Sequence, residues 1–233
     1  MFKIYLIFLF ISLNSYAQFK SDDEVNLVST GGNTDLKSYN IGSKNQYKVD
    51  KSIYFLSAKY TYGESFNVRS VEAWNIDLKF ERKLKETLGI YIGQNMESDR
   101  FSGISRSYNS DLGLNYTLLH SERKKIDLQA GYRYTIEKAV DESLAKLKDS
   151  KGRINVNSEF LISEKNKVEL NIEYLPNFTN SEDYLINFEP SLSASLSNIF
   201  SLKVGYVWKY DNEPIPGKGK HNYTFTTGLL ASF

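Results

Sequence analysis

Apolar and polar residues alternate with a period of two along most of this chain, and this pattern is its strongest constraint on a fold. In the run 126–137, apolar side chains stand at the even positions and polar or small ones at the odd positions. The runs 74–81, 153–160 and 202–210 show largely the same alternation. Because successive side chains of a β-strand point to opposite faces, each run predicts a strand with one apolar and one polar face.

Counting such runs predicts about twelve strands. Their connectors fall into two alternating kinds: tight, often charged turns such as 120–125, and mostly longer loops such as 63–70, 139–150 and 211–220. Short turns at one end and longer loops at the other are typical of outer-membrane β-barrels. The predicted strands lie near residues 24–30, 37–48, 52–62, 70–83, 88–98, 107–119, 126–138, 151–162, 168–176, 184–196, 200–210 and 221–233.

Residues 1–17 predict a secretory signal peptide. Lys3 is followed by an apolar run too short to span a bilayer, and Ser15 and Ala17 precede the expected cleavage point. Residues 18–233 are then expected to form a single barrel domain, because no linker or low-complexity tract divides them. The chain has no Cys, which excludes disulfides and thiol metal sites. Its net charge of +1 offers no basic stripe, so a nucleic-acid partner is not expected.

Alternation alone does not say whether the apolar face points into the barrel or out toward lipid. Twelve strands enclose a lumen too wide for side chains to fill as a dry core. Aromatic residues lie near strand ends, as Tyr54 and Tyr62 bracket Leu56 and Ala58, and the tyrosines as a group are expected in membrane-interface girdles. We therefore predict an all-β fold: a transmembrane, antiparallel up-and-down β-barrel of about 12 strands with short periplasmic turns and longer extracellular loops.

The C-terminal stretch HNYTFTTGLLASF, residues 221–233, alternates up to its last residue. If this strand pairs with the first one, the barrel closes and leaves no unpaired edge in lipid. A terminal aromatic after alternating apolar residues also resembles the targeting signal read by the barrel-assembly machinery. We predict integral insertion in the outer membrane of a Gram-negative-type bacterium, in contact with lipid and lipopolysaccharide. The residues assigned to the targeting strand are Tyr223, Phe225, Leu229, Ala231 and Phe233.

Several short words along the chain resemble those of a known family. They include TGGNTD (30–35), DRFSG (99–103), EYLPNFTNSEDY (173–184) and YDNEPIPGK (210–218). Together with the ending TFTTGLLASF, they resemble the YdiY-like family, described as salt-induced outer-membrane proteins and classed as a domain of unknown function. The resemblance covers nearly all of the chain after residue 17. It implies an outer-membrane barrel and a salt-related role, and it brings no substrate and no catalytic residues.

The polar face of the predicted strands should line the lumen, and it carries charges of both signs. One sign usually dominates the constriction of an ion-selective porin, so mixed charges favour a narrow or closed lumen in which they pair. No cofactor or metal site is expected. The turn-rich loop 211–220 has the composition of a shaped loop that folds over the pore. The charged residues assigned to the lumen are Lys44, Lys59, Asp77, Lys79, Glu81, Asp111, Arg133, Glu137, Arg153, Glu159, Glu173, Glu189, Lys203 and Lys209.

These observations favour a protein without enzymatic activity. It is expected to be a narrow channel for small solutes, or an envelope component related to salt and osmotic conditions, the latter by resemblance alone. Two alternatives stay open. One is a lipid hydrolase at the barrel rim that uses Ser29 and His221, although no nucleophile-elbow motif surrounds Ser29. The other is a closed structural barrel whose loops bind a partner.

Overall fold

The computed structural model of the 233-residue chain describes residues 18–30 and 36–233. The expected signal peptide, residues 1–17, lies outside the described residues, so its cleavage stays a prediction. Within the two described ranges, no helix is long and apolar enough to cross a membrane.

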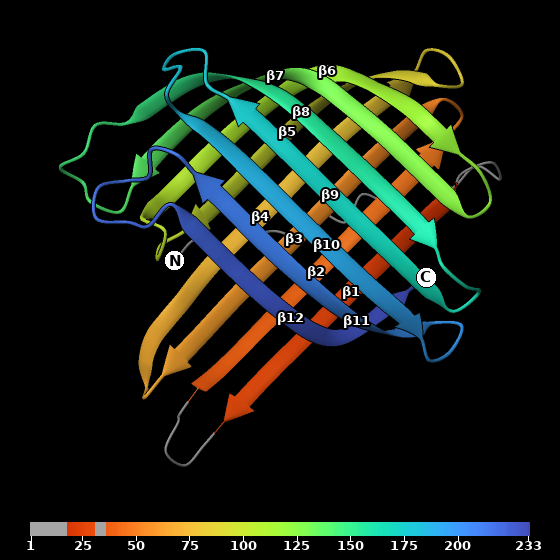
Figure 1. Ribbon diagram of the computed structural model, residues 1–233, viewed down its shortest axis with the longest axis horizontal. Coiled ribbons are helices and arrows are strands. Elements are labelled where there is room, and N and C mark those ends of the chain that lie inside the picture. The colour runs from red at the N-terminus through yellow and green to blue at the C-terminus, as the bar shows by residue number, and fades with distance from the viewer. Residues whose placement is uncertain (1–17, 31–35) are drawn as a thin grey trace, which may run out of the picture.

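Twelve antiparallel strands form one sheet that closes on itself (Figure 1). Each strand pairs with its neighbours in sequence, and β12 pairs with β1, which confirms the predicted up-and-down barrel. The loops after β7 and β11 lie at the end opposite the C-terminus (Figure 1). The strands are β1 (Gln18–Thr30), β2 (Leu36–Val49), β3 (Ser52–Ser65), β4 (Val68–Lys83), β5 (Leu88–Asp99), β6 (Ile104–His120), β7 (Lys124–Ala139), β8 (Leu147–Leu161), β9 (Asn166–Pro176), β10 (Tyr184–Ser195), β11 (Phe200–Asp211) and β12 (His221–Ser232).

The barrel is polar inside and apolar outside. Among the described residues, eighteen polar or charged residues are buried, against five apolar ones. Leu56, Leu78 and Leu112 lie mid-strand and are 45%, 47% and 52% exposed. A water-soluble domain buries such side chains, because each loses roughly 1.5–3 kcal/mol when left in water. The outward apolar face therefore fits the prediction of a barrel with lipid as its solvent.

Outward aromatic rings gather toward both ends of the strands. Near the long-loop end, Tyr39 on β2 stacks on Tyr62 on β3, with ring centroids 5.3 Å apart. Near the short-turn end, Tyr54 on β3 contacts Phe80 on β4 at 5.1 Å. These two levels have the arrangement of the girdles that anchor a barrel at its two membrane interfaces.

Several predicted boundaries were wrong by a few residues; β8, for example, begins at Leu147 and not near residue 151. β1 begins at Gln18 and not near residue 24, because residues 18–23 extend its ladder with β2. The expected long loop 63–70 is a two-residue turn, since Phe66 and Asn67 adopt φ angles of 50° and 58°. Two successive positive φ angles match the right-handed twist of a hairpin, so β3 and β4 stay paired beyond the expected strand ends.

The seam between β1 and β12 closes the barrel over four residue pairs, from Asp22–Ser232 to Val25–Leu229. The last residue takes part: the Ser21 amide donates to the Phe233 carbonyl at 3.0 Å, and the Phe233 amide donates back at 2.8 Å. The backbones approach closely at Gly228. A Cβ there would lie 2.3 Å from the Val25 carbonyl oxygen and within van der Waals overlap of Asn26. Only glycine fits this position of the seam.

We predict that Gly228→Ala destabilises the closed barrel. The added methyl group must displace the β1 backbone, and such overpacking costs about 1–3 kcal/mol. The matched control is Gly42→Ala in β2, where the nearest atom to a new Cβ is the Ala58 carbonyl at 3.7 Å. Urea unfolding in detergent, followed by heat-modifiable gel mobility, measures both variants. Equal stability of the two variants would contradict the tight seam.

Candidate functional site in the barrel lumen

One main cavity of about 950 Å³ runs along the lumen. Its lining begins near the short-turn end, at Asp22 and Lys125, and reaches Ile215 and Lys218 in the β11–β12 loop at the opposite end. A second cavity of about 320 Å³ lies against β3, β4 and β5 and shares several lining residues with the first. The lumen is therefore partly filled by side chains and retains space along its length.

Thirteen of the fourteen charged residues assigned to the lumen from the sequence line one of the two cavities, and Glu81 lines neither. Glu81 is buried and accepts a hydrogen bond from the Asn115 amide at 3.0 Å, beside neither cavity. What these side chains do for passage remains a prediction. Those that line one of the two cavities are Lys44, Lys59, Asp77, Lys79, Asp111, Arg133, Glu137, Arg153, Glu159, Glu173, Glu189, Lys203 and Lys209.

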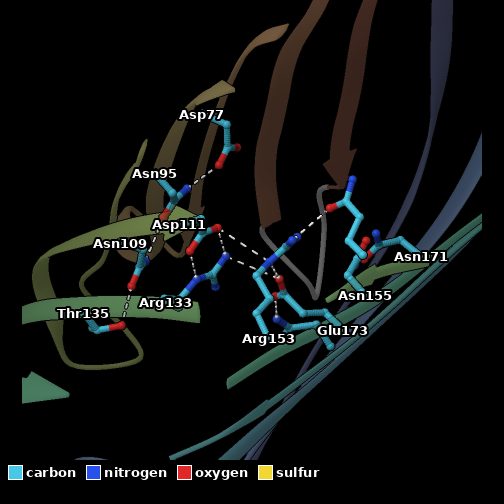
Figure 2. Close-up of polar contacts among 12 residues, drawn as sticks. Asp77, Asn95, Asn109, Asp111, Arg133, Thr135, Arg153, Asn155, Asn171 and Glu173 are labelled. Carbon is cyan, nitrogen blue, oxygen red and sulfur yellow. Dashed lines mark hydrogen bonds and ion pairs between the residues drawn. The ribbon is translucent and has the colours of Figure 1, made fainter. Parts of the chain in front are cut away.

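Four of these residues form a compact ionic cluster on the wall of β6 to β9 (Figure 2). Arg133 holds Asp111 with two hydrogen bonds of 2.7 and 2.8 Å. Arg153 donates to Glu173 at 2.6 Å. The two pairs are cross-linked, because Arg133 lies 3.4 Å from Glu173 and Arg153 lies 3.6 Å from Asp111. Each side chain is only 11–12% exposed, so these ions have exchanged most of their water for one another.

A chain of hydrogen-bonded polar side chains lies beside the cluster on the same wall (Figure 2). Ser57 on β3 donates to Asp77 at 3.1 Å, and Asn95 on β5 donates to the same carboxylate at 2.7 Å. Asn109 on β6 donates to Asn95 at 2.9 Å and accepts from Thr135 on β7 at 2.7 Å. These contacts and the ionic cluster are two neighbouring networks, together called the polar belt, which cover the wall from β3 to β9 and satisfy side chains that would otherwise be buried without partners.

Tyr91 is the residue that the sequence reasoning missed. It was grouped with the girdle tyrosines, yet it faces the lumen and is 1% exposed. Its ring lies over Gly113 and Gly131, where a Cβ would come within 3 Å of the phenol. Its hydroxyl accepts a hydrogen bond of 2.9 Å from Arg153. Its odd position in 88–98, on the polar face with Gly89 and Gly93, was the available signal.

The opposite wall, formed by β11, β12, β1 and β2, also borders the main cavity and includes several small residues. Gly42, Gly205 and Thr226 line the main cavity on this side. Lys203 on β11 reaches across β12 to Glu24 on β1 and donates a hydrogen bond of 2.7 Å. The main cavity is therefore bordered by both walls, since polar-belt residues such as Asp77, Asn109 and Thr135 line it as well.

The β11–β12 loop, residues 212–220, reaches across the mouth of the barrel. In the order of strands, this loop lies opposite the β5–β6 loop, and Ile215 packs there against Gly103, whose φ is +90°. Glu213 accepts a hydrogen bond of 2.6 Å from Asn180 in the β9–β10 loop. Pro214, Ile215 and Pro216 line the cavity below. The loop thus narrows the entrance from above.

The structure describes the side chain of only one of the two residues of the hydrolase alternative, His221. His221 is exposed and stacks on Trp208 and Tyr210, with ring centroids 5.8 and 5.0 Å away. The side chain of Ser29 lies outside the described part of the structure, and the described β1–β12 ladder ends at Val25. In the same described ranges, no group of three or more His, Cys, Asp or Glu is placed to hold a metal ion. His221 therefore belongs to the outer aromatic belt.

The residues assigned to the targeting strand lie on the outer face of β12. Ala231 is half-buried and the other four are exposed. Their recognition by an assembly machinery remains a prediction. The set is Tyr223, Phe225, Leu229, Ala231 and Phe233.

Comparison with solved structures finds outer-membrane porins and channels of similar fold. The KdgM porin superposes with a TM-score of 0.52 at 14% identity, over 91% of this chain and 99% of that one. The NanC porin also gives a TM-score of 0.52, at 10% identity over 91% and 97% of the two chains. An outer membrane channel from Pseudomonas putida F1 gives 0.52 at 9% identity over 95% and 97%. At these identities the likeness establishes the fold, an outer-membrane channel-type β-barrel.

The family follows from the sequence itself. Residues 24–233 match the family described as "Protein of unknown function, DUF481", and the chain belongs to this family. The family corresponds to the YdiY-like proteins, which confirms the resemblance seen in the sequence. No curated protein matches the chain.

We predict that Glu173→Gln lowers the free energy of unfolding by about 3 kcal/mol, because it leaves two buried guanidinium groups with one carboxylate. The matched control is Glu142→Gln, which removes a carboxylate that is 85% exposed and paired with Lys138 at 3.4 Å. An exposed pair of this kind contributes at most about 1 kcal/mol. Urea unfolding in detergent, followed by tryptophan fluorescence, measures both. Similar losses in the two variants would show that the ionic cluster adds no particular stability.

Proposed function

We propose that this protein is a narrow, passive channel for small hydrophilic solutes in the outer membrane of a Gram-negative bacterium. The observation that carries the proposal is the main cavity, whose lining extends from Asp22 near one end of the barrel to Lys218 in the loop at the other. A barrel that served only as a scaffold would have no need of polar space along its whole length.

Two features support a narrow passage and not a wide pore. The polar belt fills the lumen on the side of β3 to β9, and its ionic cluster is fixed by hydrogen bonds of 2.6 to 2.8 Å. The β11–β12 loop covers part of the mouth, with Ile215 packed on Gly103. Small polar solutes fit past such constrictions, whereas large ones are excluded by size.

The remaining parts of the proposal concern surroundings and activity. The outer girdles and the alternating β12 support contact with lipid and lipopolysaccharide, and insertion by the barrel-assembly machinery. The stacking of His221 on Trp208 and Tyr210 supports a structural role for this residue and a protein without hydrolase activity. A salt-related role follows from the family resemblance alone and is proposed on that basis.

The experiment is single-channel recording of the refolded protein in planar lipid bilayers. We expect small, steady unitary currents, and uptake of small but not large sugars into proteoliposomes. Refolding is checked first by heat-modifiable gel mobility. A correctly folded barrel that carries no current would contradict the channel, and a conductance as large as that of a general diffusion porin would contradict the narrow passage.

We predict that shortening the β11–β12 loop increases the current. Replacing residues 213–219 by Asn-Gly removes Ile215 and its contact with Gly103 and widens the entrance, so the unitary conductance should rise about two-fold or more. The control is Phe66→Ser, which alters an apolar loop tip at the same end that is 61% exposed and does not line the cavity. An unchanged conductance in the shortened variant would show that the loop does not restrict passage.

A further inference from the structure

We propose that this channel prefers small cations to anions, because the wall of its lumen carries an excess of carboxylates concentrated at both ends. The inference rests on the proposed channel function and names its class of solute. Fourteen Asp and Glu line the main cavity, against nine Lys and Arg. The whole chain, by contrast, has 28 acidic and 29 basic residues. The excess is therefore a property of the lumen and not of the chain.

The arginines in the middle of the lumen do not attract anions. Arg133 and Arg153 are each bonded to a carboxylate, and with Asp111 and Glu173 they form a cluster of zero net charge. An anion could bind these guanidinium groups only by displacing a carboxylate that is held at 2.6 to 2.8 Å. The middle of the passage is therefore polar and close to neutral.

The long-loop end is acidic. Lys151 is shared between Asp149 and Asp183, at 3.6 and 4.0 Å, so one cation faces two carboxylates. Asp149 is 3% exposed, and its Oδ2 accepts no hydrogen bond from the described residues. The negative charge of the carboxylates at this end is thus only partly balanced by cations and hydrogen-bond donors of the protein. The acidic residues that line the cavity here are Glu97, Asp99, Glu137, Asp183, Asp211 and Glu213, and the basic ones are Lys151, Lys209 and Lys218.

At the short-turn end, carboxylates again outnumber the basic residues that line the cavity. Two of its lysines are already paired, Lys125 with Asp127 at 2.8 Å and Lys203 with Glu24 at 2.7 Å. Glu169 is paired with Lys167, which does not line the cavity, at 3.2 Å, and Asp22 and Glu159 are in no ion pair with a described residue. The acidic residues that line the cavity at this end are Asp22, Glu24, Asp127, Glu159 and Glu169, and the basic ones are Lys44, Lys125 and Lys203.

Charge of one sign at both mouths of a narrow passage raises the local concentration of counter-ions and repels ions of the same sign. Four lysines oppose this effect, since Lys44, Lys59, Lys209 and Lys218 line the cavity and make no ion pair within 4 Å to a described residue. They are outnumbered by carboxylates. The Debye length is about 10 Å at 0.1 M salt and about 3 Å at 1 M, so the preference should weaken as salt rises.

The test is the reversal potential of the full-length refolded channel in a KCl gradient. We expect a permeability ratio of K⁺ to Cl⁻ several-fold above 1 at 0.1 M, falling toward 1 near 1 M. The variant Glu97→Gln/Asp99→Asn removes two carboxylates from the acidic mouth and should lower the ratio about two-fold or more. Heat-modifiable mobility shows that each variant is folded.

The matched control is Asp141→Asn/Glu142→Gln, in the loop after β7 at the same end. Asp141 caps Ser143 with hydrogen bonds of 2.9 and 2.7 Å, much as Asp99 caps Ser102 at 3.0 and 2.8 Å. The Ser143 hydroxyl and amide lower the pKa of Asp141, so the control also removes a real charge. Neither control residue lines the cavity. We expect an unchanged permeability ratio.

The outcomes separate the two proposals. A ratio at or below 1 in the unaltered channel would overturn cation preference and leave the channel function standing. An equal drop in the control variant would overturn the assignment to the lumen wall. A folded barrel without current would refute the channel function, and the cation preference would fall with it.

Discussion

The closed ring of backbone hydrogen bonds is the constraint on which the rest of this structure depends. In lipid, every backbone amide and carbonyl group must find a partner within the protein, and only a sheet without edges achieves this with strands. The seam between β1 and β12 completes the ring, down to the reciprocal bonds between Ser21 and Phe233. Closure in turn dictates two faces of opposite character, and hence the alternation that runs through the sequence.

Closure also creates a wide interior whose polar and charged side chains need partners. A core of this width cannot be packed with apolar side chains, so polar residues fill part of the lumen and also line the cavity. The belt from β3 to β9 holds its charges with ion pairs or with neutral hydrogen-bond donors, while small residues such as Gly42, Gly205 and Thr226 line the cavity on the strands beside the seam. The excess of carboxylates is then left to the two ends, where water reaches it.

Much of this could be predicted from the sequence, because the side chains of a barrel strand alternate between the inner and the outer face. Strand number, the inside and outside faces and the mixed lumen charge could all be read from alternation. Contacts across non-neighbouring strands could not: Asp111 and Arg133 are direct register partners, but Arg133 reaches Glu173 only through the curvature of β7 to β9. Tyr91 was missed because its residue type suggested a girdle, although its position placed it inside. The turn at Phe66–Asn67 was missed because it needs two non-glycine residues at positive φ.

The uneven cross-linking of the barrel wall has a mechanical consequence. On one half of the circumference, neighbouring strands are joined by main-chain ladders and again by the side chains of the polar belt, with Tyr91 laid across β6 and β7 as a brace. On the other half, the wall includes the seam, whose described ladder holds four residue pairs while β1 and β2 share thirteen. The barrel therefore has a stiff side and a compliant side. Lateral tension in the membrane would be taken up on the compliant side, at the seam.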